Sequence, residues 1–141
     1  MTVTEAPRLL TRPIPVAEQC CPFCGDLGDR IEAVVGSTFA IRDGYPVTPG
    51  HFLILPKRHV ADYFDLTDRE RRDTDRLLRR VRDLLLAEDP TIEGFNIGVN
   101  CGIAAGQTVS HAHIHLIPRR SGDVPDPRGG VRGVIADRMR Y

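Results

Sequence analysis

The sequence predicts an α+β domain, in which an antiparallel sheet packs against a single long helix. The first observation behind this prediction is a series of short apolar or alternating runs, bounded by turn-forming residues, which are typical of strands. The second is one stretch after Thr67 whose leucines and valine repeat at helical spacing. The expected strands cover residues 31–35, 38–42, 52–55, 95–99 and 111–117.

Turn signals separate the first three strands. Gly36-Ser37 joins the first pair, and residues 43–46 (Asp-Gly-Tyr-Pro) and Pro49-Gly50 follow the second strand. Residues 52–55 are apolar throughout, and their length and β-branching favour a strand buried on both faces.

The helix has clear start and stop signals. Thr67 is a suitable N-cap, and Glu70 three residues later completes a capping box. Apolar residues at 77, 78, 81, 84 and 85 form one face, and Pro90 follows the end. The first two turns are almost entirely charged, so we expect them to project into solvent. The next strand, 95–99, alternates apolar and small polar residues.

Composition excludes several classes of protein. The chain has 141 residues, 41% hydrophobic and 27% charged, which suits one domain with its own core. Lysine plus arginine equals aspartate plus glutamate, 19 against 19, so we expect neither a nucleic acid nor a membrane partner. Residues 1–15 lack a hydrophobic run of signal-peptide type, and we expect a cytoplasmic protein whose four cysteines are reduced or metal-bound.

The most informative motif is His-Ala-His-Ile-His at residues 111–115. In a strand, successive side chains point to opposite faces, so His111, His113 and His115 are expected to line one face. Imidazole can act as a nucleophile, a proton carrier, a metal ligand or a hydrogen-bond donor to phosphate. A half-buried strand with solvent-facing histidines is the alternative. Because solvent positions rarely select one titratable residue three times, the motif indicates a functional site.

Cys21 and Cys24 form a Cys-x-x-Cys motif, which is either a zinc half-site or a redox dithiol. The redox interpretation requires a helix start in a thioredoxin-like context, whereas this motif precedes a strand. A closed zinc site needs two further ligands, and His51, His59 and the histidines of residues 111–115 are the choices. Cys20 offers an alternative thiol, and a metal-free cysteine pair also stays open.

A glycine-rich loop over residues 102–108 runs directly into the histidine strand. Glycines let backbone N–H groups approach a phosphate closely, and Gln107 and Thr108 add side-chain donors. A hairpin loop would use the same residues, but the neighbouring imidazoles make this loop a candidate phosphate site.

These residues resemble the signature of the histidine triad (HIT) superfamily. The resemblance rests on Asn100-Cys101-Gly102, on Ala105-Gly106-Gln107-Thr108-Val109 and on the run from His111 to Ile117. The stretch from Asp43 to His59 is similar to the first half of the family pattern. The match runs from about Cys21 to Arg119, and the Cys-x-x-Cys pair is similar to that of the zinc-containing bacterial branch.

The resemblance implies an α+β fold that pairs into a homodimer. We expect a HIT domain over 19–120 and a C-terminal tail over 121–141 that packs on or near the site. Residues 1–18 lack periodicity, which predicts an irregular N-terminal arm. In the zinc-bearing branch the ligands correspond to Cys21, Cys24, His59 and His111, and the Zn²⁺ ion they imply is structural.

The resemblance also assigns the nucleotide site. The middle histidine of the triad, here His113, attacks the α-phosphorus of a nucleotide and forms a covalent nucleotidyl-imidazole that water cleaves. His115 binds the α-phosphate oxygens. The remaining matches are Gln107 and Thr108 at phosphate or leaving-group positions, Asn100 and Gly106 at phosphate-pocket positions, and Asp43 on the ribose hydroxyls.

The leading interpretation is a nucleotide hydrolase or nucleotidyl transferase acting on a dinucleoside polyphosphate, such as diadenosine tetraphosphate, or on a nucleoside phosphoramidate. The first alternative is a nucleotide-binding regulatory protein with vestigial catalysis. The second is a metalloenzyme whose catalytic metal is held by the triad itself. Five strand residues span roughly 13 Å, at ~3.3 Å per residue, so one ion cannot contact all three imidazoles.

Overall fold

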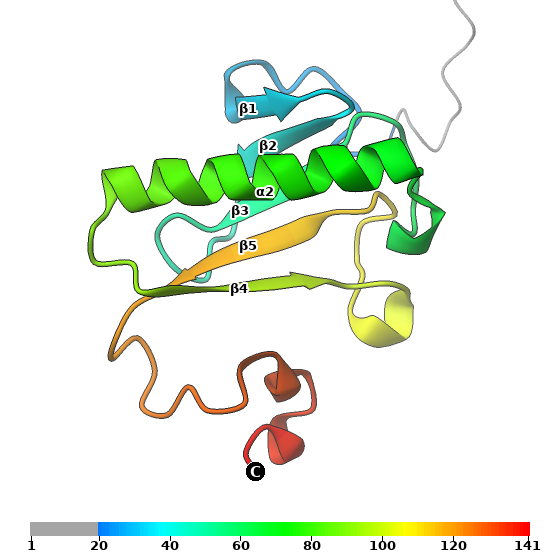
Figure 1. Ribbon diagram of the computed structural model, residues 1–141. Coiled ribbons are helices and arrows are strands. Elements are labelled where there is room, and N and C mark those ends of the chain that lie inside the picture. Colours follow the sequence, from blue (N-terminus) through cyan, green and yellow to red (C-terminus); the bar gives the residue numbers. More distant parts are fainter. Residues whose placement is uncertain (1–19) are drawn as a thin grey trace, which may run out of the picture.

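The structure is a computed structural model that describes residues 20–141; the expected irregular arm over 1–18 lies outside the described residues. Five antiparallel strands form one sheet in the order β1-β2-β3-β5-β4, and helix α2 crosses one face of it (Figure 1). The α+β prediction is confirmed. The elements are β1 Ile31–Val35, β2 Thr38–Arg42, β3 Phe52–Pro56, α2 Asp68–Glu88, β4 Gly94–Val99 and β5 Ile114–Arg119. Among the described residues, no helix is long and apolar enough to cross a membrane.

Helix α2 begins where its capping box predicts. Thr67 Oγ1 accepts a hydrogen bond from Glu70 N at 3.1 Å, and the Glu70 carboxylate accepts one from Thr67 N at 2.9 Å. The apolar stripe of the helix is buried in the core against Ile54 and Leu116 of the central strands. Its members are Leu77, Val81 and Leu85.

The first turns of α2 are not wholly solvent-exposed, which corrects the expectation drawn from their charge. Glu70 and Asp73 are buried. The Glu70 carboxylate receives both Nε and Nη2 of Arg58 at 2.9 Å, and Asp73 Oδ2 receives the backbone N–H and hydroxyl of Ser37 at 2.9 and 2.7 Å. Buried carboxylates are tolerated here because each accepts several hydrogen bonds.

Strand β5 begins at Ile114 rather than at His111, so the expected row of three imidazoles on one strand face is wrong. The β3–β5 ladder ends at the pair Ile54↔Ile114. Beyond that pair, the chain contacts the last residue of β3 and the segment after it: His111 Nε2 lies 2.9 Å from the Pro56 carbonyl, and Ala112 N donates to Val60 O at 2.7 Å. His111 is therefore drawn into the interior, while His115 stays on the sheet face opposite the helix.

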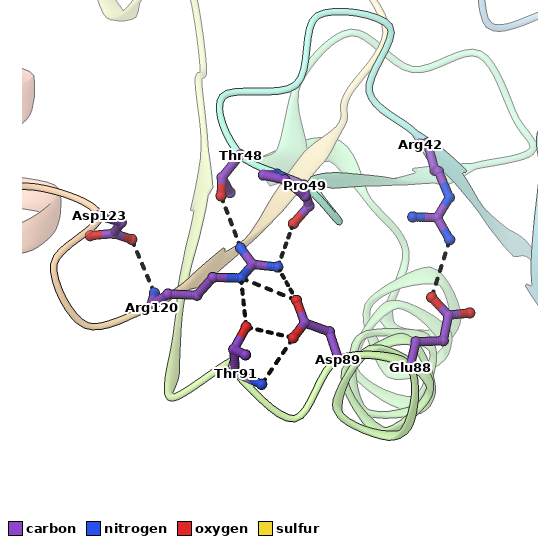
Figure 2. Close-up of polar contacts among 8 residues, drawn as sticks. All are labelled: Arg42, Thr48, Pro49, Glu88, Asp89, Thr91, Arg120 and Asp123. Atoms are coloured by element: carbon purple, nitrogen blue, oxygen red, sulfur yellow. Dashed lines mark hydrogen bonds and ion pairs between the residues drawn. The ribbon is translucent and has the colours of Figure 1, made fainter.

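Arg120 fastens the chain after β5 to two other segments (Figure 2). Its guanidinium contacts Asp89 Oδ2 at 2.6 Å, Thr48 Oγ1 at 3.0 Å and the Pro49 carbonyl at 3.0 Å. The loop between β2 and β3 is thereby tied to the end of α2 and to the start of the C-terminal tail. The tail then continues through two short 3₁₀ turns, Gly130–Val134 and Ala136–Arg138.

Candidate functional site

The predicted metal ligands lie together. Ligand atoms of Cys21, Cys24, His59 and His111 all fall within 4.8 Å of one another. Cys24 Sγ is 3.1 Å from His59 Nδ1 and 3.4 Å from His111 Nδ1, and Cys21 Sγ is 3.5 Å from His111 Nδ1. The neighbouring Cys20 is exposed and outside this cluster.

The chemistry of this cluster fits a zinc ion. Tetrahedral zinc, with Zn–S of about 2.3 Å and Zn–N of about 2.05 Å, separates sulfur from nitrogen by roughly 3.5 Å, close to the observed distances. His111 Nε2 donates to the Pro56 carbonyl, which leaves Nδ1 as the coordinating nitrogen. The Phe23 N–H lies 3.4 Å from Cys21 Sγ and stabilises negative charge on that sulfur. Four protein donors leave no open position, which is typical of a structural site.

His113 lies next to this cluster, and its orientation is fixed by the backbone. Its Nδ1 is 2.8 Å from the His111 carbonyl, which can only accept a hydrogen bond. A neutral ring bonded in this way carries its hydrogen on Nδ1 and a lone pair on Nε2. Phe23 packs against both imidazoles, with its ring centroid 5.9 Å from that of His111 and 5.5 Å from that of His113.

His115 belongs to a second polar cluster on the same side of the sheet. Its ring centroid is 5.2 Å from that of His113, and its Nδ1 is 2.9 Å from Nε2 of the buried His51. Asp43 Oδ2 is 3.3 Å from His51 Nε2 and 3.9 Å from His115 Nδ1.

Burial lowers the pKa of His51 below the ordinary histidine value, and the nearby Asp43 carboxylate opposes this shift. Burial also lowers the pKa of His115, and the positive charge that His113 or His51 would carry when protonated adds to the effect. Both rings are therefore held in their neutral form at pH 7.

An open pocket of about 600 Å³ lies beside this pair. Its polar lining residues include His51, His115 and Asn100, and β4 and the C-terminal tail contribute apolar residues. The tail supplies Val131 and Val134 to this lining. The pocket thus combines neutral imidazoles with a surface suited to a flat organic group.

A family model described as the HIT domain matches residues 34–122. The chain belongs to the HIT family. It is 40% identical over 78 residues to the asymmetrical bis(5'-nucleosyl)-tetraphosphatase of Schizosaccharomyces pombe, a match that covers 55% of this chain and 42% of that protein. It is 34% identical over 90 residues to an AP-4-A phosphorylase of Mycobacterium tuberculosis, covering 60% of this chain and 44% of that one. The chain thus spans less than half the length of either enzyme.

One solved structure similar to this chain is described as zinc-bound. The zinc-bound histidine triad family protein of Mycobacterium smegmatis superimposes with a TM-score of 0.67 at 31% identity. The superposition covers 84% of this chain and 93% of that protein.

The glycine-rich loop of this HIT domain is closed by its own side chain. Gln107 Oε1 accepts from Gly102 N at 2.8 Å, and its Nε2 donates to the carbonyls of Ala61 and Val109 at 2.8 and 3.0 Å. Gly102 and Gly106 adopt φ values of +86° and +87°, which glycine accepts without strain. Both ends of the Gln107 amide are therefore used to shape the loop.

The structure divides the predicted nucleotide-site residues between two sides of the triad. Asn100 shares the larger pocket with His115. Thr108 instead lines a smaller cavity of about 210 Å³ beside Cys21 and His59. Asp43, which the resemblance assigned to the ribose hydroxyls, contacts the His51–His115 pair.

The sequence analysis considered His51 only as a possible zinc ligand, and the ligand set implied by the resemblance left it out, although the structure places it in the polar cluster with Asp43 and His115. A usable signal was present in the expected hairpin of strands 38–42 and 52–55. Arg42 pairs with Phe52 in that hairpin, so Asp43 and His51 are the next pair of facing residues. They are joined by the Asp43 N–His51 O hydrogen bond of 2.9 Å.

Proposed function

We propose that this protein is a nucleotide hydrolase or nucleotidyl transferase that acts on a dinucleoside polyphosphate, such as diadenosine tetraphosphate, or on a nucleoside phosphoramidate. The observation that carries the proposal is the 2.8 Å contact between His113 Nδ1 and the His111 carbonyl. It assigns the hydrogen of the neutral ring to Nδ1 and leaves the lone pair on Nε2, which is the requirement for nucleophilic attack. The activities named for the tetraphosphatase and the phosphorylase support the choice of substrate class.

The reaction proceeds in two displacements. His113 Nε2 forms a bond to the α-phosphorus, and the bond from that phosphorus to the leaving oxygen or nitrogen breaks with its electron pair. The product is a nucleotidyl-imidazole. Water then attacks the same phosphorus and displaces the imidazole, which regains its neutral form. The proton that water loses to solvent balances the proton that the leaving oxygen or nitrogen takes up from solvent. His115 supplies a donor to the phosphoryl oxygens.

In this proposal Cys21, Cys24, His59 and His111 hold a structural Zn²⁺ ion. When bound, the ion would cross-link the Cys-x-x-Cys segment, the loop after β3 that carries His59 and the segment that leads into β5. The carbonyl that receives His113 Nδ1–H belongs to the ligand His111, so this cross-link orients the nucleophile from one side.

We also propose a homodimer. Within the described part of the chain β4 is an edge strand, and its Ile97 is 52% exposed. An apolar edge of this kind favours pairing with a second copy. Light scattering coupled to size-exclusion chromatography tests this proposal, and a monomeric mass at micromolar concentration contradicts it.

His113→Ala tests the assignment of the nucleophile. We expect turnover of diadenosine tetraphosphate to fall by about three orders of magnitude or more, because the covalent route is lost. Zinc content, measured by elemental analysis, should be unchanged because His113 lies outside the ligand set. If His113→Ala loses metal together with activity, the triad itself is a metal site. If the unaltered protein binds the nucleotide without turnover, it is a regulatory protein.

A further inference from the structure

His51 is a buried histidine that neither the metal site nor the proposed chemistry uses. It is 3% exposed and lies immediately before β3. The Val47 backbone N–H donates to its Nδ1 at 3.2 Å. A backbone N–H can only donate, so Nδ1 must be unprotonated. A neutral imidazole carries one hydrogen, and in His51 that hydrogen must sit on Nε2.

The tautomer of His51 determines that of His115. His51 Nε2–H faces His115 Nδ1 at 2.9 Å, with the Asp43 carboxylate at 3.3 Å as a second acceptor. His115 Nδ1 therefore accepts, and a neutral His115 must carry its hydrogen on Nε2. The charged or titratable groups facing this pair are His113 and Asp43.

We propose that His51 is a positioning residue that fixes His115 in the tautomer with a hydrogen on Nε2. The inference rests on the proposed function, in which His115 donates to a phosphoryl oxygen. No proton is transferred along the chain Val47 N–H, His51, His115. These hydrogen bonds orient the His115 Nε2–H donor before the nucleotide binds, so His115 need not reorganise during attack.

A second divalent metal site is the competing use of the same residues. Asp43, His51 and His115 present ligand atoms 2.9, 3.3 and 3.9 Å apart, distances that a small cation could span. Coordination through His51 Nε2, however, moves the ring hydrogen to Nδ1, where it points at the Val47 N–H. Two donors would then face each other in a buried site, which favours the hydrogen-bonded arrangement.

Nitrogen-15 NMR of the imidazoles in the zinc-loaded, nucleotide-free protein tests the proposal, since the two ring nitrogens differ in shift. We expect His115 to carry its hydrogen on Nε2. His51→Leu, which removes the donor, should convert His115 to a mixture of tautomers. It should lower kcat roughly a hundredfold with little change in KM, as loss of a preorganised donor does. His51→Gln, whose amide N–H can replace Nε2–H, should retain the tautomer and most of kcat.

Val47 provides a matched pair of variants. Val47→Ala keeps the backbone N–H and should leave the His115 tautomer unchanged. Val47→Pro removes the N–H, so His115 should become a mixture of tautomers. A hydrogen on His115 Nδ1 in the unaltered protein, or an unchanged tautomer in His51→Leu, overturns the proposal. One extra equivalent of Zn²⁺ bound at His51 and His115 overturns it in favour of a metal site. The NMR result does not depend on turnover, so an inactive protein with the expected tautomer contradicts the proposed function alone.

Discussion

At the scale of single residues, the site depends on which ring nitrogen carries a hydrogen. His113 is fixed by the carbonyl of His111, and His51 is fixed by the N–H of Val47. In both cases a backbone group with only one hydrogen-bonding capability selects the tautomer. Peptide groups thus orient His113 directly and His115 through His51.

The neutral state of the His51–His115 pair predicts a pH dependence of stability. Because the folded-state pKa of each ring is lowered below about 6.5, the unfolded chain binds protons first as the pH falls. The pair therefore contributes its full stability above about pH 6.5, the unfolded-state pKa. This contribution is lost as the pH falls from there through the lower folded-state pKa values. We expect the free energy of unfolding to fall more steeply between pH 7 and pH 5 in the unaltered protein than in His51→Leu, as measured by urea denaturation. Parallel pH profiles contradict this account.

At the scale of elements, hairpins and their contacts with α2 place the site. The β1–β2 turn needs Gly36, whose φ is +51°, and an added Cβ there would collide with the Asp73 carboxylate that holds Ser37. The turn therefore depends on both a local conformation and a residue of the helix. Pattern and capping predicted α2 and the strands well, because periodicity and N-cap chemistry are local.

Gly36→Ala should destabilise the protein by about 2 kcal/mol, because it strains the left-handed conformation and displaces Asp73 from Ser37. Gly44→Ala is the matched control, since a Cβ at Gly44 meets nothing within 4 Å and its backbone needs no positive φ. Urea denaturation of both variants measures the difference. Equal effects at the two glycines rule out the coupling of this turn to α2.

The ion pair between Arg120 and Asp89 gives a second prediction for these elements. Hydrogen bonds from Thr91 and Arg120 lower the pKa of Asp89 to about 2 (Figure 2). Because the pKa of Asp89 is lower in the folded state than its unfolded-state value of about 3.9, the ionised carboxylate stabilises the fold at pH values above 3.9. This stabilisation is lost as the pH falls from about 4 towards 2. Asp89→Asn should flatten the acid unfolding profile between pH 4 and pH 2, monitored by circular dichroism. An unchanged profile contradicts the role given to this contact.

At the scale of the whole molecule, the site is assembled from segments distant in the sequence, and this limits what a single sequence can predict. The cysteine and histidine ligands were predicted as a set from the family resemblance, and the structure brings all four together. The start of β5 was missed, because the contacts of residues 111–113 with Pro56 and Val60 are tertiary. The tail was expected to pack on or near the site, but its path could not be predicted, because glycine- and proline-rich chain has no periodicity and the contacts of Arg120 that direct it are tertiary.

Metal removal is the prediction at this scale. A structural ion at about 1,000 times its Kd stabilises the folded state by about 4 kcal/mol, so Cys24→Ser or a chelator should lower Tm by roughly 10 °C. Cys20→Ser is the matched control, because Cys20 is exposed and outside the ligand cluster. Calorimetry with elemental analysis measures both effects. Zinc loss in Cys20→Ser, or its retention in Cys24→Ser, contradicts the ligand assignment.

The central claim is that His113 Nε2 forms a covalent bond to phosphorus, and acid-free mass spectrometry of protein quenched during turnover tests it most directly. With a slowly hydrolysed nucleotide substrate, we predict a mass increase of one nucleotidyl group that maps to His113 and is absent in His113→Ala. Brisk turnover without any trapped adduct, or an adduct on another residue, contradicts the account.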